Sequence, residues 1–512
     1  MNKILNNAVI YQIYPISFFD SNGDGKGDFN GIKEKLLYLK ELGVNVLWLN
    51  PIFSSPFKDG GYDPIDFRSV NPDFGTMEDL RKFLIAAHCY DMRVLLDFTI
   101  CHTSIESEWF KQSQKAEPNQ YSDYYIWSNN WFESDRGMLT GISERNGCVV
   151  SSYYSHQVAL NYGYEEVENS WQMGYKDERL TPLRNEIIDI MQKWLNFGFD
   201  GFRIDLACNV IKNRKTEEPL VWFWNEVISK VKKVKPNAIF LAEWGDPLTS
   251  VGKSAFDIDY ITHECAQYNE LLRNEKGTNI IPCLEKGDSY FRAEGNGEIK
   301  NFLKYTQTIV DEINGKGAYS LPTGYHDIPR FSIGRDQEDL KVFFAFMFTY
   351  KAVPQIYYGD EIGLAYNFDV SLDGGYNRTG SRTPMQWTSG KNRGFSASDT
   401  PYLPTGNEPK TDVETQLKDE NSLLRTVQRL GKIRKENPAL FYQSDLKILE
   451  DGYPLIYERI ANDEKITVII NPSTRTYQRE ISVKEVLAQN NCSWKGSMVN
   501  IGAKSFIICK TW

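Results

Sequence analysis

The sequence has no long apolar run. No segment of the 512 residues approaches the ~20 consecutive apolar residues that a membrane-spanning helix needs. The first seven residues, MNKILNN, hold no adequate apolar core for a secretory signal peptide. These absences argue against a membrane partner, and we expect a cytoplasmic protein.

Long runs of one charge and closely spaced cysteine pairs are also missing. The 58 basic and 68 acidic residues give a net charge of −10 that is spread along the chain, which argues against nucleic acid or an anionic membrane as a partner. The eight cysteines show no Cys-x-x-Cys spacing, and several fall inside predicted strands. We expect them to be buried free thiols in a reducing compartment.

What the sequence does contain is a repeated alternation of strand and helix patterns. Apolar, strand-like segments occur at residues 9–15, 44–51, 93–99, 199–207, 238–244, 256–260, 318–327 and 354–360. Helical periodicity occurs at residues 32–42, 76–91, 181–197, 219–234, 298–313, 339–352 and 423–435. Eight predicted strands that alternate with helical segments predict an α/β fold, a closed (β/α)8 TIM barrel, over residues 1–102 and 165–438.

Two regions depart from this alternation. Residues 103–164 are aromatic and polar without clear periodicity, and they are too long for an ordinary connection, so we expect an inserted subdomain after the third strand. Residues 439–512 alternate in short β-like runs and predict a C-terminal antiparallel β-sandwich domain. At the helix starts, Thr76 to Asp79 resembles a capping box, and Thr181 is expected to be an N-cap before Pro182.

The fourth predicted strand carries the first chemical signal, within the stretch GFDGFRIDLACN at residues 198–209. Arg203 and Asp205 are two positions apart, so on a strand both side chains point the same way. An arginine beside an aspartate keeps that carboxylate ionised at neutral pH, as a nucleophile requires. For this pair alone, a structural ion pair is the alternative interpretation.

Further polar residues follow other strands of the predicted barrel. They are Glu243 after the fifth strand, His326 and Asp327 after the seventh, and His102 after the third. Catalytic groups of such barrels project from the C-terminal ends of the strands. Two carboxylates facing a glycosidic bond can cleave it, because one attacks the anomeric carbon while the other protonates the leaving oxygen and later activates water. The pattern therefore predicts a glycoside-cleaving site.

A loop after the first strand has the oxygen spacing of a calcium-binding loop. Its expected ligands are the side chains of Asp20, Asn22, Asp24 and Asp28 and the backbone carbonyl of Lys26. The bidentate glutamate of an EF-hand is absent, since Gly31 occupies that position. We expect one structural Ca²⁺, with Mg²⁺ as the alternative ion and a polar Asx turn as the alternative without metal.

Several segments together resemble a known family. Residues 97–102, 201–205, 242–243 and 326–327 resemble the four signature segments of the α-amylase superfamily, glycoside hydrolase family 13. Residues 20–28, 43–51, 354–363 and 381–387 resemble its branch of oligo-1,6-glucosidases, α-glucosidases and trehalose synthases. The resemblance covers nearly the whole chain. It implies that Asp205 is the nucleophile, Glu243 the acid/base and Asp327 the transition-state stabiliser.

The resemblance also implies how the sugar is held. The residues expected to hold or stack on the first sugar are Arg203, His102, His326 and Tyr62. In exo-acting members, an aspartate and an arginine at the positions of Asp59 and Arg378 form a pair that closes the pocket behind a non-reducing-end glucose. We expect the same pair here, with a small α-glucoside as the substrate.

Departures from the family pattern leave the substrate open. The departures are Cys101, Leu206, Cys208, Asn209 and Tyr325, and the segment QVALN at residues 157–161. We therefore expect a retaining exo-acting α-glucosidase that hydrolyses short α-glucosides, such as malto- or isomalto-oligosaccharides or related disaccharides. A transglycosylase or isomerase of the trehalose synthase type is the nearest alternative. A catalytically inactive barrel that binds a sugar or a partner protein is the remote one. The sequence does not indicate an oligomeric state.

Overall fold

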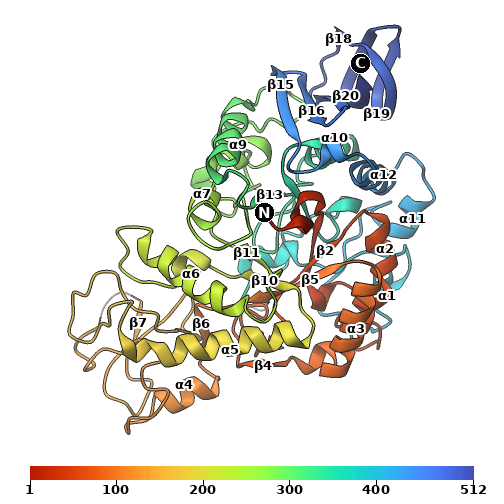
Figure 1. Cartoon of the computed structure of the whole chain (residues 1–512). Coiled ribbons are helices and arrows are strands. Elements are labelled where there is room, and N and C mark those ends of the chain that lie inside the picture. Colours follow the sequence, from red (N-terminus) through yellow and green to blue (C-terminus); the bar gives the residue numbers. More distant parts are fainter. Residues whose placement is uncertain (135–136, 373, 512) are drawn as a thin grey trace.

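The computed structural model describes residues 1–134, 137–372 and 374–511, and its centre is a closed parallel barrel (Figure 1). Around the barrel the strands run in the order β1-β14-β13-β12-β11-β10-β5-β2. Their bounds are β1 Ile10–Ile13, β2 Val46–Leu49, β5 Arg93–Phe98, β10 Gly201–Ile204, β11 Ile239–Ala242, β12 Ile258–Tyr260, β13 Ala318–Pro322 and β14 Val353–Tyr357. Seven lie within their predicted segments and β14 begins one residue before its segment, so the predicted fold class is confirmed.

Helices cover the outside of the barrel, as their amphipathic patterns predicted (Figure 1). Their bounds are α1 Phe29–Glu34, α2 Leu36–Glu41, α3 Met77–Cys89, α5 Thr181–Phe197, α6 Glu218–Val231, α7 Pro247–Ser250, α8 Ala266–Leu272, α9 Lys300–Ile313, α10 Gln337–Thr349, α11 Val413–Leu417 and α12 Leu423–Glu436. The capping box of Thr76 and Asp79 is confirmed at the start of α3.

Two helix predictions were wrong in detail. The helix predicted for residues 32–42 is divided into α1 and α2 at Lys35, which has φ −96° and ψ 5° and holds its ammonium 3.7 Å from the centre of the Phe19 ring. Thr181 is not an N-cap, because α5 begins at Thr181 itself and Leu180 precedes it in helical conformation. A short 3-10 turn at Glu178–Leu180 leads directly into α5 and supplies that conformation.

The segment after β5 forms a lobe beside the barrel, which lies at the lower left of Figure 1. It contains β6 His102–Ser104, α4 Glu108–Ser113, β7 Met138–Leu139, β8 Val149–Val150 and β9 Gln157–Ala159. β6 pairs with β9, and β7 with β8, both antiparallel. Another small sheet pairs β3 Phe53–Ser54 with β4 Asp66–Val70. The predicted domain boundaries stay predictions.

The last strands form an antiparallel sheet at one end of the molecule (Figure 1). They are β15 Asp445–Asp451, β16 Leu455–Ala461, β17 Glu464–Asn471, β18 Tyr477–Glu480, β19 Val483–Lys495 and β20 Met498–Thr511. Two buried arginines, Arg434 of α12 and Arg459 of β16, bind the C-terminal end of α10. Arg434 donates to the Phe348 carbonyl at 2.9 Å and Arg459 to the Thr349 carbonyl at 2.6 Å. Their charges suit the negative end of the helix dipole.

One glycine fixes the position of the strand that carries Arg203. Gly201 has φ +157°, and a Cβ atom there would lie 1.9 Å from the carbonyl oxygen of Ile239. Any larger residue would push β10 away from β11 and displace the side chains that follow. All eight cysteines are free thiols. No helix of the described part of the chain is both long and apolar enough to cross a membrane, and the expected location stays a prediction.

Candidate active site

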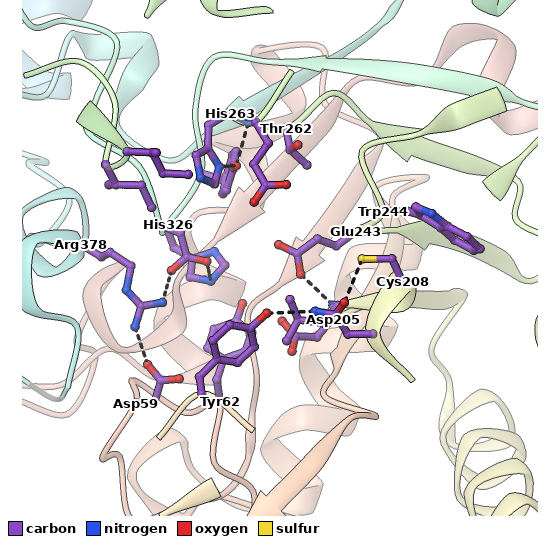
Figure 2. A pocket seen from close by; sticks show the side chains of 18 of the residues that line it. Asp59, Tyr62, Asp205, Cys208, Glu243, Trp244, Thr262, His263, His326 and Arg378 are labelled. Atoms are coloured by element: carbon purple, nitrogen blue, oxygen red, sulfur yellow. Dashed lines mark hydrogen bonds and ion pairs between the residues drawn. The ribbon is translucent and has the colours of Figure 1, made fainter. Parts of the chain in front are cut away.

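A cavity of about 410 Å³ opens among the loops that follow the barrel strands (Figure 2). Such a volume suits a small ligand. Its lining residues are Asp59, Tyr62, His102, Tyr153, Tyr154, Asp205, Leu206, Cys208, Asn209, Glu243, Trp244, Thr262, His263, Glu264, Ile280, Ile281, Tyr325, His326, Asp327 and Arg378. Eight of the nine residues predicted to be catalytic or substrate-binding therefore meet at one cavity, although they come from distant parts of the chain.

Two carboxylates of this cavity, Asp205 and Glu243, are held by the same guanidinium. Arg203 donates from Nη1 to Asp205 Oδ1 at 2.8 Å and lies 2.7 Å from Glu243 Oε2 through Nη2. Glu243 also accepts a hydrogen bond from the backbone N–H of Leu206 at 2.8 Å and one from the Tyr260 hydroxyl at 2.9 Å. Both carboxylates thus have fixed orientations beside the same space.

Arg203 itself is the ninth predicted residue, and it does not line the cavity. Its side chain is fully buried beneath the two carboxylates. Its Nη1 also donates to Asp97 at 2.8 Å, and its Nη2 to the Tyr260 hydroxyl at 3.1 Å. The structure therefore places Arg203 where it positions the carboxylates rather than where it would touch a sugar.

The predicted pair between Asp59 and Arg378 is present. Arg378 Nη2 donates to Asp59 Oδ1 at 2.8 Å (Figure 2). Its Nη1 donates to Asp327 Oδ1 at 2.9 Å. Asp327 Oδ1 accepts a further hydrogen bond from Arg382 at 3.0 Å, and Gln157 donates to the other oxygen of Asp59 at 2.8 Å. One end of the cavity is thus closed by a continuous ion-paired network.

The two predicted histidines lie in this wall as well. His326 is 3.1 Å from Asp327 through Nε2 and 3.0 Å from the Gln12 amide through Nδ1. The Tyr62 ring stacks on His326 with centroids 4.7 Å apart, and its hydroxyl donates to Asp97 at 2.7 Å. His102 Nε2 donates to the Tyr62 carbonyl at 2.6 Å. Tyr62 was predicted to stack on a sugar, and one face of its ring is already covered by His326.

Opposite electrostatic environments surround Asp205 and Asp327. Burial raises the pKa of Asp205 well above its ordinary value, since Arg203 lowers it only in part and Glu243 raises it further. Burial would also raise the pKa of Asp327, but His326, Arg378 and Arg382 together hold it well below its usual range. Asp327 is therefore ionised at any ordinary pH, whereas Asp205 titrates at a higher pH than a free aspartate.

The residues that depart from the family pattern gather on the other side of the two carboxylates. Leu206 has a left-handed backbone conformation with φ +48°, which directs its N–H to Glu243. The Cys101 thiol lies 3.4 Å from the Leu206 carbonyl. Asn209 donates to the Tyr153 hydroxyl at 3.0 Å. Tyr325 contacts His263 through its hydroxyl. These contacts shape the cavity wall without adding a charge to it.

Sequence reasoning missed three residues that hold the carboxylates. Asp97 binds Arg203, the Trp48 indole and Tyr62, and burial raises its pKa to about 6. Tyr260 donates to Glu243, and Arg382 donates to Asp327. Asp97 and Arg382 lie in segments that resemble the family, residues 97–102 and 381–387, so the resemblance could have indicated them. Tyr260 ends a weak strand pattern, and nothing in the sequence indicated its role.

The predicted calcium loop is held together by its own hydrogen bonds. Asp20 accepts the backbone N–H groups of Gly23 at 2.7 Å and Gly25 at 2.8 Å, and also the Ser396 hydroxyl at 2.6 Å. Asp28 caps α1 by accepting from Gly31 at 2.8 Å. In the described ranges no three His, Cys, Asp or Glu side chains are grouped as metal ligands. Calcium binding by this loop stays a prediction.

The sequence profile described as "Alpha amylase, catalytic domain" matches residues 12–443. Over 528 residues the chain is 31% identical to the oligo-1,6-glucosidase of Parageobacillus thermoglucosidasius, an alignment that covers 92% of this chain and 90% of that protein. It is 30% identical over 535 residues to the trehalose-6-phosphate hydrolase of Bacillus subtilis, covering 91% of this chain and 89% of that protein.

A similar solved structure is that of an isomaltulose synthase mutant from Erwinia rhapontici in complex with its natural substrate sucrose. It superposes with a TM-score of 0.80 at 25% identity and covers 99% of both chains. The relatives share the family but differ in the reactions that their names describe. The profile match spans most of the chain, and we conclude that this protein belongs to the α-amylase family and is an α-glucosidase-like glycoside hydrolase.

Proposed function

We propose that the protein is a retaining, exo-acting α-glucosidase that hydrolyses short α-glucosides, such as malto- or isomalto-oligosaccharides or related disaccharides. The observation that carries this proposal is the double ion pair of Arg378 with Asp59 and Asp327 at one end of the cavity. This ion-paired wall leaves room for the end of a sugar chain and blocks a polysaccharide that would have to pass through the cavity. The oligo-1,6-glucosidase relative supports the same substrate class.

Asp205 would be the nucleophile and Glu243 the acid/base. Asp205 attacks the anomeric carbon while Glu243 gives a proton to the leaving oxygen, which forms a glucosyl ester on Asp205 and frees the aglycone. Glu243 then takes a proton from water, which attacks the same carbon and releases glucose with its α configuration. Arg203 contacts both carboxylates and keeps them facing one bond.

Asp327 would stabilise the transition state. Because three cationic or hydrogen-bonding side chains hold its pKa low, Asp327 stays ionised and its charge favours the oxocarbenium-like sugar. Asp59, Asp327 and Arg378 border the space for glucose, and Nδ1 of His102 is a buried polar atom without a hydrogen-bond partner among the described residues, so it is available to a glucose hydroxyl. These groups act on the terminal sugar alone, as an exo-acting enzyme requires.

A transglycosylase or isomerase is the second candidate, and the likeness to an isomaltulose synthase favours it. The same two steps would occur, with a sugar hydroxyl instead of water accepting the glucosyl group. A catalytically inactive binding barrel is the third hypothesis, and a site in which Arg203 orients both carboxylates gives it no support.

The deciding experiment is a panel of maltose, isomaltose, sucrose, trehalose and soluble starch, with products followed by NMR. The proposed function predicts α-glucose as the first product from one or more disaccharides and slow action on starch. Formation of a new disaccharide from sucrose or maltose would assign the isomerase reaction. Rapid mid-chain cutting of starch, or β-glucose as the first product, would overturn the proposal.

A further inference from the structure

The cavity wall built by the loops after β10, β11 and β12 has a different composition from the ion-paired end. Apart from Asp205 and Glu243 themselves, its members include Cys208, Asn209, Trp244, Glu264, Ile280 and Ile281. Within the described residues, Glu264 is the one charged side chain that this wall adds. Burial lowers the pKa of the neighbouring His263 to about 4, so that imidazole is neutral at pH 7.

The backbone just before Glu264 is held by hydrogen bonds, and the Glu264 side chain has no partner among the described residues. The N–H of His263 donates to the Tyr325 hydroxyl at 3.2 Å, and the carbonyl of His263 accepts amide hydrogen bonds from Asn269 at 2.8 Å and Asn279 at 3.1 Å. The carboxylate of Glu264 is exposed and makes no hydrogen bond or ion pair within the part of the chain that the structure describes. The charge therefore has a defined place on the rim and available oxygens.

Among the described residues that line the cavity, no cation is left to balance this charge. The lining contains the carboxylates of Asp59, Asp205, Glu243, Glu264 and Asp327. Among the described lining residues the single lysine or arginine is Arg378, and both its Nη atoms already bind Asp59 and Asp327. A cleft lined by one sign of charge concentrates ligands of the opposite sign and repels those of the same sign.

We propose that Glu264 makes the aglycone end of the cavity select its substrates by charge. Glucosides whose aglycone carries an amine are bound and cleaved best, neutral glucosides less well, and glucosides whose aglycone carries a phosphate or carboxylate worst. This inference rests on the proposed function, because cleavage between Asp205 and Glu243 is what defines an aglycone end. Glu264 acts on binding and takes no part in the bond-breaking steps.

The test compares aminopropyl, propyl and carboxyethyl α-glucosides, which differ mainly in charge, at pH 7 and low ionic strength. For the wild-type protein we expect kcat/KM to fall in that order, with about a tenfold ratio between the amine and the carboxylate. E264Q should reduce the ratio to within about twofold, and E264K should invert it. E420Q removes an exposed carboxylate outside the cavity and should keep the wild-type ratio. Half-molar NaCl should shrink the wild-type ratio, because it shortens the Debye length to about 4 Å.

The outcomes separate the two proposals. If neither propyl α-glucoside nor any disaccharide of the panel is cleaved, the proposed function is contradicted. In that case calorimetric binding of the three glucosides to wild-type and E264Q protein still tests the charge selection. Equal rates or affinities for the three compounds, or a ratio that survives E264Q or half-molar salt, would overturn it.

Discussion

The two halves of the active-site cavity are built differently. In the half formed after β2, β13 and β14, Asp59, Arg378 and Asp327 bind one another, and His326 and Arg382 complete the network. In the half formed after β10, β11 and β12, the side chains other than Asp205 and Glu243 make few polar contacts, and Glu264 makes none among the described residues. The first half has one geometry in which all its charges are paired. Apart from Asp205 and Glu243, which pair with the buried Arg203, the second half can accept changes of side chain without leaving a buried charge unpaired.

This contrast assigns different tasks to the halves. Altering a network of buried ion pairs lowers stability, because removing one partner leaves the other charge buried and uncompensated. The glucose-binding end is therefore the part that resists substitution. Three departures from the family pattern, Leu206, Cys208 and Asn209, line the aglycone end, and a fourth, Tyr325 after β13, contacts His263 of that end. We expect substrate choice to be set there.

The largest effect is expected where the halves meet, at Asp205. D205N should lower kcat about 10⁴-fold or more, because the amide cannot form the glucosyl ester. Since burial raises the pKa of Asp205, its ionised form costs folding free energy at pH 7, and D205N should melt no lower than the wild-type protein. Activity assays and thermal melts check both parts. A variant with a tenth of the wild-type kcat would contradict the assigned role.

Breaking the ion-paired half should cost more than breaking the other half. R378A leaves Asp59 and Asp327 without a shared partner, and we expect kcat/KM to fall roughly 10²-fold with KM raised and kcat lowered together. The matched change N209A removes one hydrogen bond to the exposed Tyr153 and should cost less than about fivefold. Equal losses in the two variants would remove the contrast between the halves.

The pH profile should show the opposite charge environments of the two aspartates. As pH falls, protonation of Asp205 abolishes attack on the anomeric carbon, and its raised pKa places this loss well above the usual pKa of an aspartate, about 3.9. Asp327 remains ionised throughout and contributes nothing to that limb. The measurement is kcat/KM from pH 4 to 8, and a value that stays constant down to pH 4 would contradict it.

The smallest effect is expected outside the cavity, at the loop of Asp20 to Asp28. If Ca²⁺ binds the folded loop, millimolar calcium should raise Tm by about 2–4 °C and EDTA should reverse the rise, with no change in kcat. D24N should abolish the response, because the Asp24 side chain is among the predicted ligands. Within the loop its carboxylate accepts hydrogen bonds from the Lys26 backbone N–H and the Asn22 amide. Identical melting curves with calcium and with EDTA would leave the loop a polar turn.

The sequence predicted the parts of this protein that follow from periodicity and from strand ends. All eight barrel strands and the cavity positions of Asp205, Glu243 and Asp327 follow from apolar segments ending in polar residues. The loops that supply Asp59 and Arg378 have no periodicity, and only the family resemblance brought those two residues together.

Contacts across the barrel could not be predicted from local pattern. Tyr260 reaches Glu243 because β11 and β12 are neighbours in the closed sheet, and Arg203 is covered because its strand lies between β5 and β11. At the break, the Lys35 ammonium contacts the rings of Phe19, 16 positions earlier, and Trp387, 352 positions later. Each of these features is set by tertiary neighbours that local periodicity does not encode.

The pair of Asp59 and Arg378 joins residues 319 positions apart, and this gives the enzyme a late onset of activity. A nascent chain can shape β1 to β13 before residue 378 has left the ribosome, yet its glucose site lacks a wall until then. A single protease cut between residues 364 and 378 would likewise leave Arg378 held only through the buried residues that follow it, while most of the core remains folded. Loss of activity should therefore precede loss of structure, both during synthesis and during limited digestion.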